Sequence, residues 1–169
     1  VSLPFISSSD KESIEFATKE KVDYIGLSLV RSAENVLEIN DLLIENNNNH
    51  TSIISKIETR ESLDEIDEII RLSDGIMLDR ESLGVEIPHE RIPGIQKSLI
   101  TKCHQQSKVS IIITEMESDD NDIRPSKAEI SDISQAICDG VDSLALTGES
   151  TIGKYPVGTI NKIKKISEI

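Results

Sequence analysis

The chain has 169 residues, 37% of them hydrophobic, which is enough apolar material for one domain with a buried core. Its formal net charge of -13 disfavours nucleic acid and anionic membrane surfaces as partners. No apolar run approaches the roughly 20 residues that span a bilayer, and no signal peptide pattern opens the sequence. Because the first residue is valine, in a segment that we expect to be structured, we expect a fragment of a longer protein.

Segments with apolar residues at helical spacing alternate along the chain with short apolar runs that are typical of buried strands. In chain order, the pattern predicts a helix at 8–20, a strand at 22–30, a helix at 32–46, a strand at 52–58, a helix at 61–72, a strand at 75–79, a helix within 89–107, a strand at 108–115, a helix at 126–139, a strand at 141–147 and a helix at 158–169. Ser9 or Asp10 is expected to cap the first helix.

This alternation predicts an α/β fold, because near-continuous apolar strands are typical of parallel strands that are buried on both faces. Two architectures fit the pattern: an open doubly wound sheet, and about five units of a (β/α)₈ barrel. The open sheet would also suit a non-enzymatic interaction module of flavodoxin-like form. In both architectures, binding and catalytic sites gather at the carboxyl ends of the strands.

Every predicted strand ends in hydroxyl or charged side chains, which indicates a polar site at one edge of the sheet. Lys56 and Glu58 stand two residues apart at one strand end, so their side chains face the same side. Such a lysine can hold a phosphate or stabilise developing negative charge, and such a carboxylate can bind Mg²⁺. The same pair is also compatible with a plain ion pair at the rim of the sheet.

Two other strand ends carry candidate ligand-binding residues. Arg80 can clamp a carboxylate or phosphate, or it can lie solvated in a turn. Thr114 can donate a hydrogen bond to a ligand, or it can cap local backbone. The residue types alone leave these alternatives open.

Taken in order, six segments resemble motifs of pyruvate kinase from one end of the chain to the other. They are VSLPFISSSD (1–10), SLVRSAENV (28–36), IISKIET (53–59), SDGIMLDRESLGVEIP (73–88), IIITEM (111–116) and RPSKAEISDISQAICDGVDSLALTGES (124–150). Their spacing is close to that of the family, with one residue fewer between Thr114 and Arg124.

The resemblance implies that residues 1–169 are a single segment from the C-terminal part of the catalytic (β/α)₈ TIM barrel, supplying about its last five β/α units. It places the lid domain, the early barrel strands and the C-terminal domain outside the chain, so the chain alone is expected to be inactive. The implied activity is the glycolytic transfer of a phosphoryl group from phosphoenolpyruvate to ADP, giving pyruvate and ATP, with Mg²⁺ and K⁺. A cytoplasmic homotetramer is the implied complete form.

The resemblance also assigns roles to individual residues. Lys56 would stabilise the transferring phosphoryl group and the enolate, and Thr114 would take part in enolate protonation and substrate binding. Glu58 would be a Mg²⁺ ligand. Arg80 matches the arginine of the family's substrate-binding segment.

The chain departs from the family in the residues around Arg80. Ser82 stands where the family has its second Mg²⁺ ligand, an aspartate, and Glu81 stands where a glycine lets main-chain amides approach the substrate. Asp79 replaces an alanine, and Glu115 replaces a glutamine. Two explanations follow. Either this is a divergent pyruvate kinase in which Asp79 or Glu81 supplies the missing metal carboxylate, or it is a catalytically impaired paralogue with a structural or regulatory role.

Overall fold

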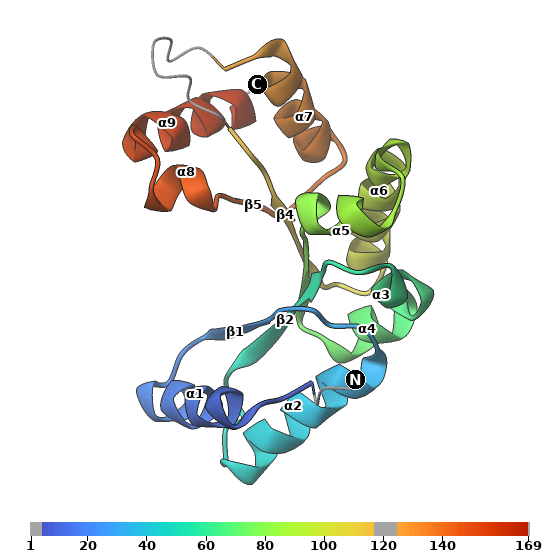
Figure 1. Ribbon diagram of the computed structural model, residues 1–169, viewed down its shortest axis with the longest axis vertical. Coiled ribbons are helices and arrows are strands. Elements are labelled where there is room, and N and C mark those ends of the chain that lie inside the picture. Colours follow the sequence, from blue (N-terminus) through green and yellow to red (C-terminus); the bar gives the residue numbers. More distant parts are fainter. Residues whose placement is uncertain (1–4, 117–124, 169) are drawn as a thin grey trace.

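Five parallel strands form one sheet in the computed structural model, which describes residues 5–116 and 125–168 (Figure 1). The strands are β1 (Tyr24–Leu27), β2 (Ser52–Ile57), β3 (Gly75–Leu78), β4 (Val109–Ile113) and β5 (Ser143–Ala145). Each lies inside a run that the sequence predicts to be a strand. The α/β prediction is therefore confirmed.

The order of the strands decides between the two predicted architectures. The sheet runs β1-β2-β3-β4-β5, and every neighbouring pair is parallel. A doubly wound sheet reverses its strand order at a switch point, and this sheet has no such reversal. The sequential order is that of a (β/α)₈ barrel, of which these strands form a continuous part.

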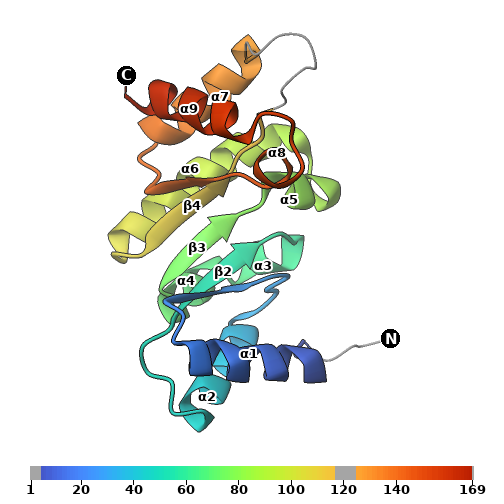
Figure 2. The same ribbon diagram turned by 90° about the vertical axis from the view of Figure 1, so that its left-hand side faces the viewer.

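Helices connect the strands, and they lie along one face of the sheet and beyond its edge strands β1 and β5 (Figures 1 and 2). They are α1 (Ser8–Glu20), α2 (Ala33–Glu45), α3 (Arg60–Asp64), α4 (Ile66–Leu72), α5 (Arg80–Glu86), a 3₁₀ turn η1 (His89–Arg91), α6 (Ile92–Gln105), α7 (Lys127–Cys138), α8 (Gly148–Thr151) and α9 (Pro156–Ser167). Across the two described ranges, none of these helices has the length and apolar character needed to cross a membrane.

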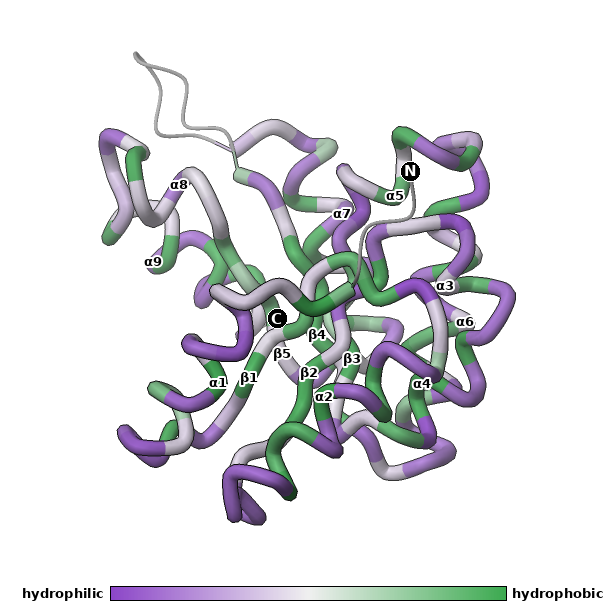
Figure 3. The backbone as a smooth tube through the Cα atoms, turned by 60° about the horizontal axis from the view of Figure 1, so that its bottom comes forward, coloured by the Kyte–Doolittle hydropathy of each residue, from purple (hydrophilic) through white to green (hydrophobic). Residues whose placement is uncertain are grey.

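The two faces of the sheet differ in burial. Ile57, Leu78 and Ile112 lie side by side on β2, β3 and β4 and are fully buried against the helices. Lys56 and Met77 lie on the opposite face and are only partly buried. The sequence predicted burial on both faces. The structure buries the face that the helices cover more completely, and the opposite face combines the buried Ile54 with the partly buried Lys56 and Met77. In Figure 3 the hydrophobic segments accordingly gather around the strands, and hydrophilic ones occupy the outer turns.

Three local features differ from the predictions. Ser7 rather than Ser9 or Asp10 caps α1, and Asp10 takes part as the second member of a capping box. The helix predicted at 61–72 is interrupted at Glu65, whose carboxylate accepts a hydrogen bond from the main-chain N–H of Ala33 at 2.8 Å. The polar residues after β3 form the helix α5, where the sequence indicated a loop.

Gly75 provides a test of the packing at the start of β3. A Cβ atom at this position would lie 2.6 Å from Ile54 Cδ1 and 3.0 Å from the main-chain oxygen of Val109. Because a neighbouring strand cannot move freely, we expect Gly75→Ala to destabilise the complete protein by about 1–3 kcal/mol. The urea midpoint measures this change.

Gly94→Ala is the matched control for Gly75→Ala. Gly94 lies in α6, and a Cβ atom there would meet nothing within 4 Å. Since alanine is favoured over glycine in helices, this variant should gain about 0.5–1 kcal/mol. A shift of both midpoints in the same direction would contradict the packing described for Gly75.

Candidate active site

The carboxyl ends of β2, β3 and β4 bring the predicted site residues to one edge of the sheet. Ile57 is paired with Leu78, and Leu78 with Ile112, so the residues that follow these strands lie at similar levels. Glu58 follows β2, and Asp79 follows β3. The geometry of this edge decides which of the predicted residues meet.

Lys56 is the centre of the group at this edge. Its Nζ lies 2.6 Å from Glu58 Oε1 and 4.0 Å from Asp79 Oδ2. The side chain of Lys56 is 23% exposed, so its ammonium can also meet a ligand. The prediction that Lys56 and Glu58 face the same side is confirmed by their contact. Asp79 adds a second carboxylate to the group.

Glu58 is the most constrained member of the group. Its side chain is only 6% exposed, and Oε2 accepts a hydrogen bond from the main-chain N–H of Leu29 at 2.5 Å. Leu29, just after β1, has a φ of 54°, a conformation that few residues other than glycine adopt. The Glu58 carboxylate therefore joins the ends of β1 and β2, and it helps to hold a strained main-chain turn beside the site.

Asp79 caps the helix α5. Its Oδ1 accepts a hydrogen bond from the main-chain N–H of Ser82 at 3.0 Å, while Oδ2 is the oxygen nearer Lys56. The carboxylate thus uses one oxygen at the start of the helix and directs the other towards Lys56. Ser82 contributes its N–H to this arrangement.

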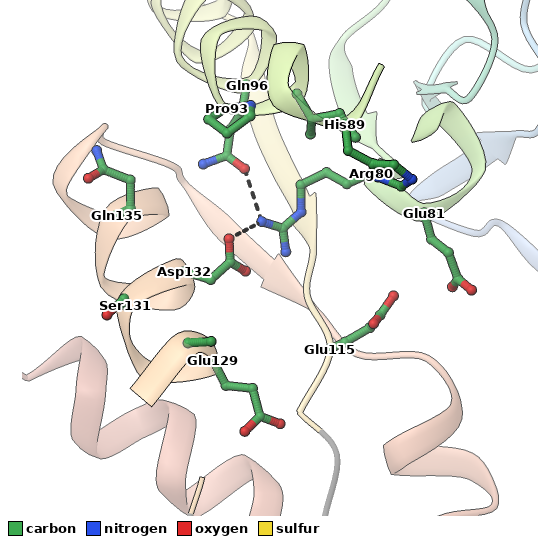
Figure 4. A pocket seen from close by; sticks show the side chains of 12 residues that line it. Arg80, Glu81, His89, Pro93, Gln96, Glu115, Glu129, Ser131, Asp132 and Gln135 are labelled. Carbon is green, nitrogen blue, oxygen red and sulfur yellow. Dashed lines mark hydrogen bonds and ion pairs between the residues drawn. The ribbon is translucent and has the colours of Figure 1, made fainter. Parts of the chain in front are cut away.

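Arg80 turns towards a different part of the molecule. Its Nε donates to the main-chain oxygen of Ile113 at 3.2 Å, and its Nη1 contacts Gln96 Oε1 at 3.3 Å and Asp132 Oδ1 at 2.5 Å (Figure 4). These partners lie on β4, α6 and α7, and Gln96 and Asp132 border a pocket of about 720 Å³ together with Arg80. Among the described contacts, none joins Arg80 to Lys56 or Glu58.

Glu81 and Glu115 line the same pocket, and their side chains approach the same space (Figure 4). Partial burial raises the pKa of Glu115, and the negative charge of Glu81 and a hydrogen bond with it raise this pKa further. Glu149 acts in the same direction, whereas Arg80 lowers the pKa. The pair therefore concentrates negative charge beside the first turn of α5.

Thr114 lies at the end of β4 and is 1% exposed. Its main-chain N–H donates to the oxygen of Ala145 at 2.9 Å, which continues the pairing of β4 with β5. Its Oγ1 is buried and has no hydrogen-bond partner among the described residues. A buried hydroxyl without a partner is a group that a ligand can satisfy.

The residues of this edge fit a Mg²⁺ ion in a limited way. Within residues 5–116 and 125–168, no group of three or more histidine, cysteine, aspartate or glutamate side chains converges to hold a metal. Glu58 and Asp79 do approach the same ammonium, so two carboxylates face one region. Mg²⁺ is commonly held by one or two carboxylates, with water and substrate oxygens completing its octahedron.

The sequence did not predict the hydrogen-bond partners that hold Arg80 or the chain segments that follow β4 and β5. Asp132 and Gln96 hold Arg80, and Glu149 accepts hydrogen bonds from the main-chain N–H groups of Met116 and Thr147 at 3.0 and 3.2 Å. Asp132 lies inside a motif recognised from the sequence. The negative charge of Asp132, opposite to that of Arg80, was the one signal in the sequence that could have suggested this contact. The two residues are 52 positions apart, so no local pattern indicated that they meet.

The raised pKa of Glu115 predicts a pH-dependent effect of the substitution Glu115→Gln. Because the carboxyl group ionises less readily in the folded state, its charge lowers stability at pH values above the folded-state pKa. This cost falls as the pH decreases, and it vanishes below the ordinary value of 4.5. We expect the variant to be more stable than the parent at pH 7, with a gain that shrinks towards pH 4.

Denaturant unfolding of the complete protein at several pH values measures this gain. Glu12→Gln is the control, since Glu12 is exposed on α1 and its side chain makes no described contact. A gain from Glu115→Gln that grows as the pH falls would contradict the charge arrangement described above.

Comparison with known proteins agrees with the motif resemblance. A family model described as the barrel domain of pyruvate kinase matches residues 1–160. The chain is 46% identical over 168 residues to a pyruvate kinase of Sporosarcina psychrophila, covering 99% of this chain and 29% of the relative. It is 43% identical over 169 residues to a pyruvate kinase of Clostridium acetobutylicum, covering 99% and 36%. The chain thus spans about a third of the length of these relatives, and it belongs to the pyruvate kinase family as part of the barrel domain.

Proposed function

We propose that the complete protein carrying this chain transfers a phosphoryl group from phosphoenolpyruvate to ADP, giving pyruvate and ATP in glycolysis. The observation that carries this proposal is the contact of Lys56 with Glu58 and the approach of Asp79 at the strand ends. These residues combine a cation for phosphate with carboxylates for a metal. The lid, the early strands and the C-terminal domain are proposed to lie outside residues 1–169, so the chain alone would be inactive.

Lys56 is proposed to stabilise the negative charge that develops on the phosphoryl group and on the enolate. Its ammonium is held by a buried carboxylate and remains partly exposed, so it can contact an anion without a large rearrangement. Thr114 is proposed to donate its buried hydroxyl to the substrate and to take part in protonating the enolate. Arg80 supports substrate binding through the position of α5, since its own side chain is engaged by Asp132.

Glu58 and Asp79 are proposed to hold Mg²⁺, which supplies charge neutralisation for the phosphoryl oxygens when bound. Asp79 takes this role because its Oδ2 faces Lys56 while Oδ1 caps α5. Ser82, at the family's aspartate position, has only a neutral hydroxyl to offer. The K⁺ site and the nucleotide site are proposed to depend on residues outside this chain. A homotetramer in the cytoplasm, with no nucleic acid or membrane partner, completes the proposal.

A catalytically impaired paralogue is the alternative, and one observation favours it. Glu81 and Glu115 place negative charge in the neighbourhood of the first turn of α5, and the fold raises the pKa of Glu115. An anionic substrate approaching this turn would be repelled. The protein would then keep the barrel for a structural or regulatory role.

A coupled assay of the complete protein with phosphoenolpyruvate, ADP and Mg²⁺ tests the proposed activity. We expect turnover, and we expect Lys56→Met to lower kcat by about 10²-fold or more, because charge stabilisation is the main contribution of the residue. Lys11→Met on the exposed surface of α1 should leave kcat unchanged. A folded protein without turnover that gains it on the double substitution Glu81→Gly and Ser82→Asp would support the impaired paralogue instead.

Metal titration tests the proposed ligands separately from activity. Replacing Mg²⁺ by Mn²⁺ allows binding to be followed by electron paramagnetic resonance. Glu58→Gln and Asp79→Asn should each weaken Mn²⁺ binding by about tenfold or more, and Ser82→Ala should weaken it less. Asp41→Asn, an exposed acid on α2, is the control. A larger loss for Ser82→Ala than for Asp79→Asn would contradict the proposed ligands.

A further inference from the structure

The amino ends of the strands, opposite the candidate active site, carry a repeated hydrogen bond. Asp74 precedes β3, and its Oδ2 accepts the main-chain N–H of Ile53 at 2.8 Å. Asp142 precedes β5, and its Oδ2 accepts the main-chain N–H of Ser110 at 2.8 Å. Ile53 and Ser110 are the second residues of β2 and β4. In both cases an aspartate before one strand fixes the start of the preceding strand.

The other two inner strands, β2 and β4, are preceded by side chains that donate hydrogen bonds instead of accepting them. Thr51 precedes β2 and donates its hydroxyl to the main-chain oxygen of Val22 at 2.8 Å. Lys108 precedes β4 and donates its ammonium to the main-chain oxygen of Ser73 at 2.6 Å. Acceptor side chains therefore precede β3 and β5, and donor side chains precede β2 and β4. The pattern has a period of two strands.

The first residues of β2 and β4 repeat with the same period. The main-chain N–H of Ser52 donates to the oxygen of Asp23 at 2.9 Å, and that of Val109 donates to the oxygen of Asp74 at 3.3 Å. Asp23, which precedes β1, thus holds the place that Asp74 holds before β3. The carboxylate of Asp23 is exposed, and it has no partner among the described residues.

Within the described residues, both edge strands, β1 and β5, are less buried than the strands between them. Tyr24, the first residue of β1, is 62% exposed, and Leu27 is the one residue of β1 in the buried class. In β2, by contrast, four of six residues are buried. A strand that paired with β1 would meet both an exposed aromatic ring and an unused carboxylate.

We propose that Asp23 fixes the start of a further parallel strand of the same barrel, which pairs with the free edge of β1. Its carboxylate accepts the main-chain N–H of the second residue of that strand, which therefore cannot be proline. The same two-strand period predicts the hydrogen bonds at the free edge of β5. A strand paired with β5 would donate its first N–H to the main-chain oxygen of Asp142, and a donor side chain before it would reach the oxygen of Val141.

Denaturant unfolding of the complete protein tests the role of Asp23. Asp23→Ala should raise the unfolding equilibrium constant by about tenfold or more, as expected for the loss of a hydrogen bond to a charged group. Asp74→Ala is the positive control, because its partner Ile53 is known. Asp41→Ala is the control for an exposed acid, and it should change the constant little. Asp23→Asn keeps an acceptor oxygen and should recover part of the loss.

Amide hydrogen exchange on the same variants locates the partner. In Asp23→Ala the start of one strand outside residues 1–169 should exchange faster, and Asp23→Asn should restore part of its protection. If Asp23→Ala does not fold, Asp23→Asn carries the comparison, and its faster exchange at that strand supports the proposal. Unfolding and exchange that match those of Asp41→Ala would overturn it.

Discussion

The contact between Lys56 and the buried carboxylate of Glu58 is the interaction on which the site depends. A carboxylate with so little exposure needs partners for its charge, and Lys56 and the N–H of Leu29 supply them. Removing either partner would leave a buried charge uncompensated. The Glu58 carboxylate therefore joins the ends of β1 and β2, and the ion pair holds the partly exposed ammonium of Lys56 beside them. The lysine that supports the fold is thus also the residue proposed to stabilise the transferring phosphoryl group.

The substitutions around this pair are unequal in their effects. The charge of Asp79 is balanced by Lys56 and by the first turn of α5, so the fold accommodates it. Glu115 faces Glu81 and Glu149. Among the described residues Arg80 alone offsets them, and Arg80 is itself engaged by Asp132. The negative charge at this edge is therefore less well compensated at the glutamates than at the aspartate.

The sequence predicted the strands and the sidedness of Lys56 and Glu58 because both follow from local periodicity. It did not predict α5, since four polar residues after a strand are equally typical of a turn, and the cap by Asp79 becomes visible only in three dimensions. The partners of Arg80 were also missed. Asp132 lies 52 residues away in the chain, and no local pattern records such a contact. The roles of the site residues stay predictions.

The hydrogen bonds at the amino ends of the strands have a consequence for how this barrel can evolve. Asp74 and Asp142 fix strand positions at the end of the sheet farthest from Lys56. Since strand alignment is secured there, residues at the opposite end that lie outside the Lys56–Glu58 ion pair can be exchanged with less effect on folding. A lineage can then accumulate changes such as those at Asp79 and Glu81, and lose or redirect its chemistry, long before its barrel stops assembling.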